Sequence, residues 1–331
     1  MRIPRVAILA IVALALPFLA VPAKAATPLK IGVAYDTGGP GDYSYNDAVA
    51  AGVESAKKRY YIEVLATVTI GSDADRELRL NSLISKGAQY IIAVGKGYAP
   101  AVERASLLNS KVQFGIVNDA SVKSLNVSSL VFNEKQGGYL AGAAAALISK
   151  TEKVGILANS AQGKKFEIGF SRGARSVKKS ISVSSRYGAD HFGDLAKELI
   201  AGGVDVIFIA TAGSDSEVLA TLVDANKNGH KISFIGIEPD QYVSLSPTAK
   251  KYILASVVKR VDRVIVDFVS AAQTGLPITD ILDPIQGIYG RNYGIVEGGI
   301  ELSVWSYALT KFKREIKSAT IRARRLAIIN K

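Results

Sequence analysis

The sequence contains no cysteine and only two histidines, His191 and His230. Without cysteine the chain has no disulfide, no thiolate nucleophile and no cysteine for lipid attachment. The two histidines do not stand in the HExxH spacing of a zinc hydrolase, and no Walker A loop is present. We therefore expect a protein without a metal site or a cofactor.

Long hydrophobic runs are also scarce. The one long run, Val6–Val21, follows Arg2 and Arg5 and precedes Ala23-Lys24-Ala25. This order is typical of a secretory signal peptide, and the run is short for a membrane span and interrupted by Pro17. We predict cleavage after Ala25. The product is then a soluble exported protein without a lipid anchor, located in the periplasm, at the cell surface or outside the cell.

Acidic residues are outnumbered, and much of the basic excess lies near the C-terminus. The formal net charge of +12 falls to +9 once the signal peptide removes Arg2, Arg5 and Lys24. Residues 311–331 contain eight basic side chains and a single acid, Glu315. This segment could hold the protein near anionic lipid or a partner. Its helical spacing favours a terminal helix that packs on the body through Phe312, Ile316, Ala319 and Leu326. A secreted protein is not expected to bind nucleic acid.

After the signal peptide, apolar strand-like runs alternate with segments of helical period. Strands are expected at 30–35, 62–69, 89–94, 112–117, 129–133, 153–158, 182–187, 204–210, 233–237 and 252–257. Helices are expected at 45–60, 75–86, 98–108, 136–149, 164–179, 193–202, 215–228 and 259–274. This alternation is typical of parallel sheets covered by helices on both faces. The length favours two lobes, with a seam near Phe132–Gly138.

Asp36–Asn46 combines an acid, glycines, a hydroxyl, an aromatic ring and an amide directly after the first strand. Open α/β sheets bind ligands at the carboxyl ends of their strands, so this segment is a candidate binding loop. Ser44 is placed to cap the helix that follows. The alternative is an ordinary glycine-rich turn.

Polar groups end several other predicted strands. They are Asn118-Asp119, Asn159-Ser160, Gly213-Ser214-Asp215, Glu238-Pro239-Asp240-Gln241 and Lys259. Each alone is more often a cap or a turn. Together they would place acids, amides and one ammonium at one end of two sheets. Such a ring suits a small, neutral, polyhydroxylated or heterocyclic ligand. It does not suit a phosphate, because acids outnumber bases.

One string matches a catalytic pattern. Gly169-Phe-Ser171-Arg-Gly173 fits the G-x-S-x-G nucleophile elbow, which requires the serine at a turn between a strand and a helix. Here Ser171 lies well inside the helix expected at 164–179. The string is therefore better explained by small residues on a packing helix.

The chain resembles the basic membrane protein family of substrate-binding proteins, which includes purine-nucleoside receptors of ABC importers. The resemblance rests on segments that follow one another in the family's order. They are Asp36 with Gly39 and Asp42–Asn46, Ser72–Asp75, Gly87–Gly95, Phe132–Gly142, Gly236–Gln241 and Ala255–Lys259. The resemblance implies a type I periplasmic-binding-protein fold. In this fold two doubly wound parallel-sheet lobes are joined by a hinge of several crossovers and close on the ligand.

The resemblance also implies positions for the lobes and the binding residues. The first lobe would contain 26–133 and about 258–286, and the second 134–257 and about 287–331 with the basic terminal helix. The residues implied to bind a nucleoside are Asp36, Asn46, Asp119, Glu238 and Lys259 by hydrogen bonds, Tyr45 by stacking, Gly213 and Ser214 as the wall of the second lobe, and Asp240. The string Tyr139-Leu-Ala-Gly142 looks structural, since small residues allow its helix to pack closely at the junction of the lobes.

Three departures from the family pattern concern the ligand and the anchor. The family's usual phenylalanine is Tyr45, whose hydroxyl needs a partner, and its usual aspartate is Glu238. The usual lipoprotein cysteine is absent.

The resemblance predicts a non-catalytic, monomeric receptor that binds a nucleoside-like solute and delivers it to an ABC permease in the membrane. The alternatives are an exported nucleoside hydrolase and a sensor that contacts a membrane receptor.

Overall fold

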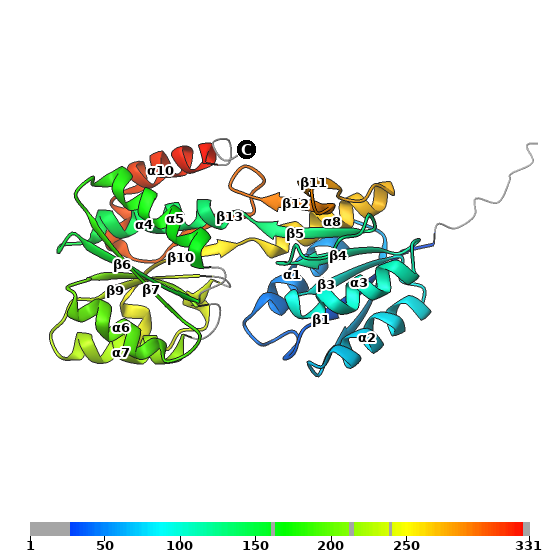
Figure 1. Cartoon of the computed structure of the whole chain (residues 1–331), viewed down its shortest axis with the longest axis horizontal. Helices are drawn as coiled ribbons and strands as arrows, with labels where there is room; N and C mark the ends of the chain where they lie inside the picture. Colours follow the sequence, from blue (N-terminus) through cyan, green and yellow to red (C-terminus); the bar gives the residue numbers. More distant parts are fainter. Residues whose placement is uncertain (1–26, 160–162, 212–214, 238–239, 327–331) are drawn as a thin grey trace, which may run out of the picture.

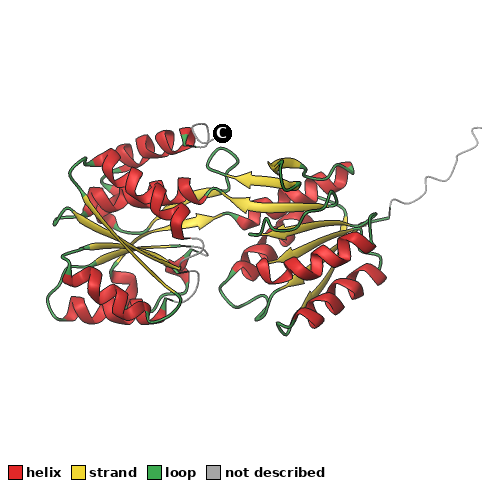
Figure 2. Ribbon diagram, in the orientation of Figure 1, coloured by secondary structure: helices red, strands yellow, loops and turns green. Residues whose placement is uncertain are grey.

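The computed structural model describes residues 27–159, 163–211, 215–237 and 240–326. These residues form two α/β lobes that lie side by side along the long axis of the molecule (Figure 1). Each lobe has one sheet with helices on both of its faces (Figure 2). The predicted signal peptide, residues 1–25, lies outside the described residues.

The sheet of the first lobe has seven strands in the order β11-β12-β5-β4-β3-β1-β2. All neighbouring strands are parallel except β11 and β12, which pair antiparallel. The strands are β1 (Leu29–Tyr35), β2 (Ile62–Val68), β3 (Tyr90–Val94), β4 (Gln113–Val117), β5 (Val127–Phe132), β11 (Asp280–Asp283) and β12 (Ile288–Tyr293).

The sheet of the second lobe has six strands in the order β13-β10-β9-β8-β6-β7. They are parallel except for the antiparallel pair of β10 and β13. The strands are β6 (Lys153–Asn159), β7 (Ser182–Gly188), β8 (Val206–Ala210), β9 (Ser233–Gly236), β10 (Ile253–Lys259) and β13 (Ile300–Val304). The strand order reverses next to β1 in one sheet and next to β6 in the other, and such reversal points are where open sheets bind ligands.

The helices follow the expected alternation with the strands. The longer ones are α1 (Tyr45–Lys57), α2 (Asp73–Ser85), α3 (Ala99–Leu108), α4 (Glu134–Ile148), α5 (Gly163–Val177), α6 (Phe192–Ala201), α7 (Ser216–Lys227), α8 (Val261–Thr274) and α10 (Lys313–Arg325). Shorter turns are η1 (Lys96–Tyr98), η2 (Gln241–Val243), η3 (Ala249–Lys251) and α9 (Tyr307–Thr310). All ten predicted strands and all eight predicted internal helices are confirmed within a few residues. The sequence reading missed β11, β12 and β13.

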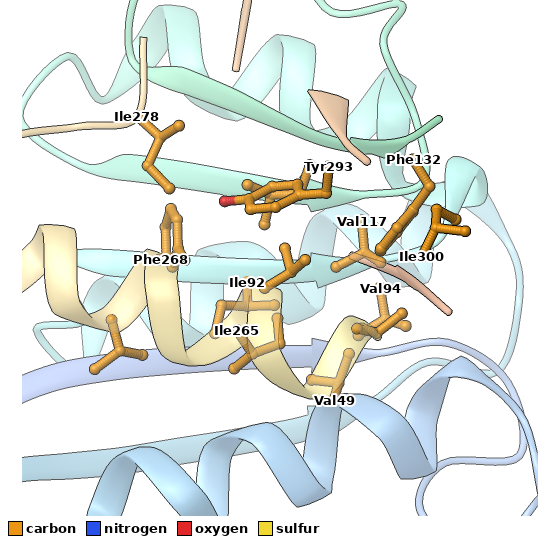
Figure 3. Close-up of a cluster of buried hydrophobic side chains, with 14 of the residues drawn as sticks. Val49, Ile92, Val94, Val117, Phe132, Ile265, Phe268, Ile278, Tyr293 and Ile300 are labelled. Atoms are coloured by element: carbon orange, nitrogen blue, oxygen red, sulfur yellow. The ribbon is translucent and has the colours of Figure 1, made fainter. Parts of the chain in front are cut away.

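Buried apolar side chains fill both faces of each sheet. In the first lobe α1 and α8 cover one face, and Figure 3 shows Val49, Ile92, Ile265 and Phe268 packed there. The other face is covered by α2 and α3. In the second lobe α4 and α5 cover one face, and α6 and α7 cover the other. Nearly continuous apolar strands such as β8, which is buried throughout, are therefore explained by burial on both sides.

The chain passes between the lobes three times. It crosses after β5 at Phe132, after β10 at Lys259, and between β12 and β13 at residues 294–299. The third crossing lies slightly later than the boundary expected at about 286, because β12 pairs with β5 in the first sheet. Within β12 a glycine is required next to β5, since a Cβ on Gly290 would lie 2.0 Å from the carbonyl oxygen of Ser129.

The three crossings are bonded to one another. The amide of Asn133 donates to the carbonyl of Tyr293 at 3.0 Å, and the amide of Arg260 donates to Gly299 at 2.8 Å. Arg260 also pairs with Asp262 and, at 3.1 Å, with Glu301. Burial opposes ionisation of Asp262, but the hydrogen bonds and charge of Arg260 outweigh it and lower the pKa of that carboxyl group. The hinge therefore consists of three crossing segments that are linked by hydrogen bonds and ion pairs.

The helices α4 and α5 pack with their backbones in close contact. A Cβ on Gly142 or Gly173 would lie 2.0 Å from the carbonyl oxygen of Phe170 or Tyr139, respectively. A Cβ on Gly169 would likewise lie 2.0 Å from the carbonyl oxygen of Lys135. The Gly169-x-Ser171-x-Gly173 string is thus on a packing helix, as predicted, and Ser171 does not stand at a turn between a strand and a helix.

The basic C-terminal segment forms α10, which packs on α4. Its buried residues are Ala319 and Ala323, and Ile316 and Leu326 pack at the edges of the core, which confirms three of the four predicted docking residues. The fourth, Phe312, is half-buried and precedes the helix. Arg322 also donates to the hydroxyl of Tyr139. The other basic side chains of α10 are exposed.

Asp75 fastens the first turn of α2 to the loop that precedes it. Its backbone amide donates to Ser72, the residue that caps the helix, and its carboxylate accepts from the hydroxyl of Thr69 at 2.7 Å and the amide of Ile70 at 2.9 Å. Arg79 pairs with the same carboxylate at 3.0 Å. These hydrogen bonds, that from Thr69 first, lower the pKa of Asp75 to about 2.

Asp75 should make the protein sensitive to acid. Because its pKa is lower in the folded than in the unfolded protein, its stabilising contribution is complete above about pH 4 and is lost as the pH falls toward about 2. We expect Asp75→Asn to be less stable than wild type at neutral pH and to lose less stability across that interval. Urea unfolding at a series of pH values measures this. Asp73→Asn, which changes an exposed neighbour, should retain the wild-type pH profile; an identical profile for Asp75→Asn would contradict the assignment.

Candidate functional site

A cavity of about 860 Å³ lies between the two lobes. Its wall on the first lobe is the loop after β1, residues 42–45, and its wall on the second lobe is α7 and residues 241–249. The lining residues are Asp42, Tyr43, Ser44, Tyr45, Asp215, Ser216, Leu219, Ala220, Val223, Asp224, Lys227, Gln241, Ser244, Leu245, Ser246, Thr248 and Ala249. Its volume is in the range of small-molecule sites, which are 300–1,000 Å³.

The charged residues of this cavity are mostly acidic. Asp42, Asp215 and Asp224 line it, whereas Lys227 is the one basic residue among its described lining residues, and it pairs with Asp224 at 3.1 Å. Tyr43 and Tyr45 add aromatic surface from the first lobe. The electrostatics therefore disfavour an anionic ligand and favour a neutral one with hydroxyl or amino donors.

Asn46 organises the loop after β1. Its side chain is buried and bonds the backbone of Asp36 and Thr37, and its amide donates to Asp42 at 2.7 Å. Ser44 caps α1 as predicted, accepting from the amide of Asn46. Asn46 was predicted to bind the ligand; the structure places its side chain inside the loop, where it holds the residues that line the cavity.

Tyr45 and Lys259 meet at the junction of the lobes. The ammonium of Lys259, at the end of β10, donates to the hydroxyl of Tyr45 at 3.2 Å and lies 6.0 Å from the centre of its ring. The tyrosine hydroxyl that replaces a phenylalanine of the family pattern thus has its partner. Lys259 also donates to Asn118 at 3.3 Å and Glu134 at 2.9 Å. Of the strand ends predicted to converge, the loop after β1, Asn118 after β4 and Lys259 at the end of β10 meet here.

Asp36 and Asp119 are engaged elsewhere. The carboxylate of Asp36, about one-third exposed, pairs with Arg76 at 3.0 Å and accepts from the amide of Thr37. Asp119 accepts from the amide and hydroxyl of Ser121 in a local turn. Asp36 follows β1, which borders the reversal point of the sheet, and Asp119 follows β4, but neither is among the residues that line the cavity.

Asp240 points toward an aromatic pair in the second lobe. It accepts from the indole of Trp305 at 2.9 Å and caps η2 through the amide of Tyr242. The rings of Tyr242 and Trp305 stack with their centres 4.0 Å apart. Asp240 was predicted as a ligand residue, and in this arrangement it holds that stack. The other predicted residues of the second lobe, Gly213, Ser214 and Glu238, lie outside the described residues.

Sequence reasoning did not single out Gln241, Asp215 or Glu134 as site residues. Gln241 lines the cavity and donates to Asp215, and both follow strand ends that the sequence analysis had noted. Glu134 lies in Phe132–Gly142, a segment that carried the family resemblance and to which no binding role was given. Glu134 is recognised as a site residue by its ion pair with Lys259, which only the three-dimensional structure shows.

The part of the chain that the structure describes holds no group of three or more His, Asp or Glu side chains that could bind a metal ion. Within the same residues no helix is both long and apolar enough to cross a membrane.

The comparisons with known proteins agree with this architecture. Residues 29–321 match the family model described as ABC transporter substrate-binding protein PnrA-like. A CD4+ T-cell-stimulating antigen of Listeria monocytogenes is 30% identical over 76% of this chain and 76% of its own. An ABC transporter nucleoside-binding protein, BmpA, of Lactococcus lactis is 28% identical over 91% of this chain and 87% of its own.

Solved structures show the same fold. A transcriptional activator of the comK gene from Bacillus halodurans has 24% identity and a TM-score of 0.72, covering 88% of this chain and 96% of its own. AraP, an arabinose-binding protein from Geobacillus stearothermophilus, has 14% identity and a TM-score of 0.64, covering 86% of this chain and 98% of its own. The fold is the type I periplasmic-binding-protein fold, as the resemblance implied. With its sequence match along both lobes and its cavity between them, the chain belongs to the PnrA-like family of ABC transporter substrate-binding proteins, which are binding proteins and not enzymes.

Proposed function

We propose that this protein is exported and captures an uncharged nucleoside-like solute between its lobes for delivery to an ABC permease. The observation that carries the proposal is the cavity itself. It has aromatic surface from Tyr45 and Tyr43, many hydroxyl and amide groups on the opposite wall, and more acids than bases. Carboxylates accept hydrogen bonds from sugar hydroxyls, while aromatic rings cover the faces of a heterocycle.

The family relationship supports the same substrate class. A relative that aligns with nine-tenths of this chain is named as a nucleoside-binding protein, and the alignment includes both walls of the cavity. Closure of the two lobes on the ligand would bring the strand ends that now hold Asp36 and Asp119 closer to the second lobe.

Thermal unfolding with a panel of ligands tests the proposal. A ligand that binds the folded protein raises the melting temperature by mass action. We expect inosine, guanosine or adenosine to raise it at micromolar concentrations, and free sugars and riboflavin to have no effect. A rise with sugars or riboflavin alone would remove the nucleoside from the proposal and leave the receptor. Release of free base from a bound nucleoside would instead support the hydrolase alternative.

Tyr45 provides a first mutational check. We expect Tyr45→Ala to weaken nucleoside binding by about 1–3 kcal/mol, the contribution of a base stacked on an aromatic ring. Tyr45→Phe keeps the ring and removes the hydroxyl, so it should retain most of the affinity. Titration calorimetry of both variants measures the difference. Equal affinities for wild type and Tyr45→Ala would place the base elsewhere in the cavity.

A further inference from the structure

The basic side chains of the C-terminal helix have no acidic partners. Residues 311–325 contain seven basic side chains and a single acid, Glu315. In the part of the chain that the structure describes, none of the seven forms an ion pair. Several other helices instead carry a lysine paired with an acid one turn away. Because like charges one turn apart, as at Lys313 and Lys317, destabilise a helix, the cluster does not serve the stability of the fold.

The outward face of α10 carries an apolar side chain among these cations. Ile321 is 47% exposed. Lys317, Arg324 and Arg325 lie four residues before it and three and four residues after it, so they share its face of the helix. All three are exposed. This face is therefore complementary to a partner that is negatively charged at its surface and apolar just beneath it.

A groove of about 580 Å³ extends this face along one side of α10. Its walls combine aliphatic side chains with cations, and its described lining residues include no acid. They are Val304, Leu309, Thr310, Lys313, Ile316, Lys317, Thr320, Ile321 and Arg324. The groove offers an apolar chain a place to lie beside ammonium and guanidinium groups, which are the common partners of phosphate.

The basic helix and the cavity between the lobes lie on opposite sides of the second sheet. α10 packs on α4, which covers one face of that sheet, whereas α7, a wall of the cavity, covers the other face. Figure 1 shows α10 and α7 at opposite edges of the second lobe. A partner bound to α10 would therefore leave the cavity open.

We propose that α10 and its groove bind the surface of an anionic phospholipid membrane. Lys317, Arg324 and Arg325 contact the phosphate groups, and Ile321 reaches the apolar boundary beneath them. A phospholipid surface offers both chemistries, whereas a hydrophilic polyanion offers only the first. Each Lys or Arg close to an anionic membrane contributes about fivefold to the affinity, so the exposed cations of α10 together are sufficient for reversible attachment. The proposal does not depend on which solute the cavity binds.

Sedimentation with lipid vesicles tests the proposal. The protein used begins at Ala26, because the hydrophobic run Val6–Val21 would enter vesicles by itself, and both lobes lie within the residues that remain. We expect it to bind vesicles of phosphatidylcholine mixed with phosphatidylglycerol, and to bind vesicles of phosphatidylcholine alone much less. Added salt should weaken the binding, because it screens exposed charges. Equal binding to both kinds of vesicle, or binding to neither, would overturn the proposal.

A variant that combines Lys313→Gln, Lys317→Gln and Arg324→Gln locates the binding surface. All three side chains are exposed, so the variant should fold, as its melting transition verifies. We expect it to bind the mixed vesicles at least about tenfold more weakly than wild type.

The matched control combines Lys57→Gln, Arg104→Gln and Lys197→Gln. It removes the same charge from α1, α3 and α6 and should bind the mixed vesicles as wild type does. Equal losses in the two combined variants would show that net charge, and not α10, determines the binding, which would overturn the proposal.

Ile321→Ser separates a lipid surface from a hydrophilic polyanion. We expect it to weaken binding to the mixed vesicles about threefold or more, because roughly half of an isoleucine side chain leaves water there. The salt concentration that elutes the protein from a heparin column should stay the same. If wild type binds heparin but no vesicle, or if Ile321→Ser binds the vesicles as well as wild type, α10 binds polyanions in general and the proposal is wrong.

Discussion

Replacing Gly173 with alanine is expected to lower the free energy of unfolding by about 3 kcal/mol or more, at the upper end of the cost of overpacking a core. The added Cβ would lie 2.0 Å from the carbonyl oxygen of Tyr139 on α4, and the next nearest atoms are also backbone. Because backbone atoms cannot rotate away as a flexible side chain does, α5 would have to move off α4. That movement would also disturb the contacts of Gly169 and Gly142 along the same interface.

Chemical denaturation measures this loss, with ligand absent so that binding does not contribute. Gly202→Ala is the matched control. Gly202 ends α6 with an ordinary φ of −72°, and its added Cβ would lie no closer than 3.3 Å to a neighbouring atom. We expect Gly202→Ala to leave stability nearly unchanged. A Gly173→Ala protein as stable as this control would show that α4 and α5 are not packed backbone against backbone.

The second large effect is expected for Lys259→Ala. Alanine would leave the carboxylate of Glu134, whose side chain is 8% exposed, without its cation. Removing one partner of a buried ion pair costs about 3–5 kcal/mol of stability. Binding should weaken as well, because Lys259 no longer holds the loop after β1 and Asn118 together at the junction of the lobes.

Denaturation and ligand titration together separate the two effects of Lys259→Ala. Lys227→Ala is the comparison: Lys227 lines the cavity, but about two-thirds of its side chain is exposed, and its pair with Asp224 is one helical turn away. Exposed pairs of this kind contribute about 0.3–0.5 kcal/mol. Similar stabilities for Lys259→Ala and Lys227→Ala would show that the carboxylate of Glu134 finds water or another partner when the lysine is gone.

The sequence predicted the central strands well because they are apolar on both faces, and the helices because their apolar residues recur at helical spacing. The three strands that it missed differ in this respect. β11 reads Asp-Ile-Leu-Asp, and β12 contains Gly, Arg and Asn. These strands pair at a sheet edge or inside the hinge, where neighbouring backbone supplies the contacts that the side chains do not. The spacing of apolar residues in the sequence therefore does not indicate that these strands pair.

The candidate site combines positions that the sequence indicated with side-chain contacts that it did not indicate. The loop after β1 does line a cavity, and Lys259 does reach Tyr45. The side chain of Asn46, however, forms its hydrogen bonds with the backbone of its own loop, as asparagine side chains in turns commonly do. Asp240 bonds Trp305, more than sixty residues later in the chain. Polar residues after predicted strands indicate one edge of a sheet. They do not indicate the direction in which each side chain points or which partner it binds.

The three crossings of the chain between the lobes also constrain the order in which the protein can fold. β5 ends at Phe132, yet its neighbour β12 begins only at Ile288, and α4 and α10 add side chains to the core of the first lobe. Neither sheet is complete until nearly the whole polypeptide is available. Contacts so distant in sequence form slowly. A chain emerging from a ribosome would therefore remain incompletely folded until late in its synthesis.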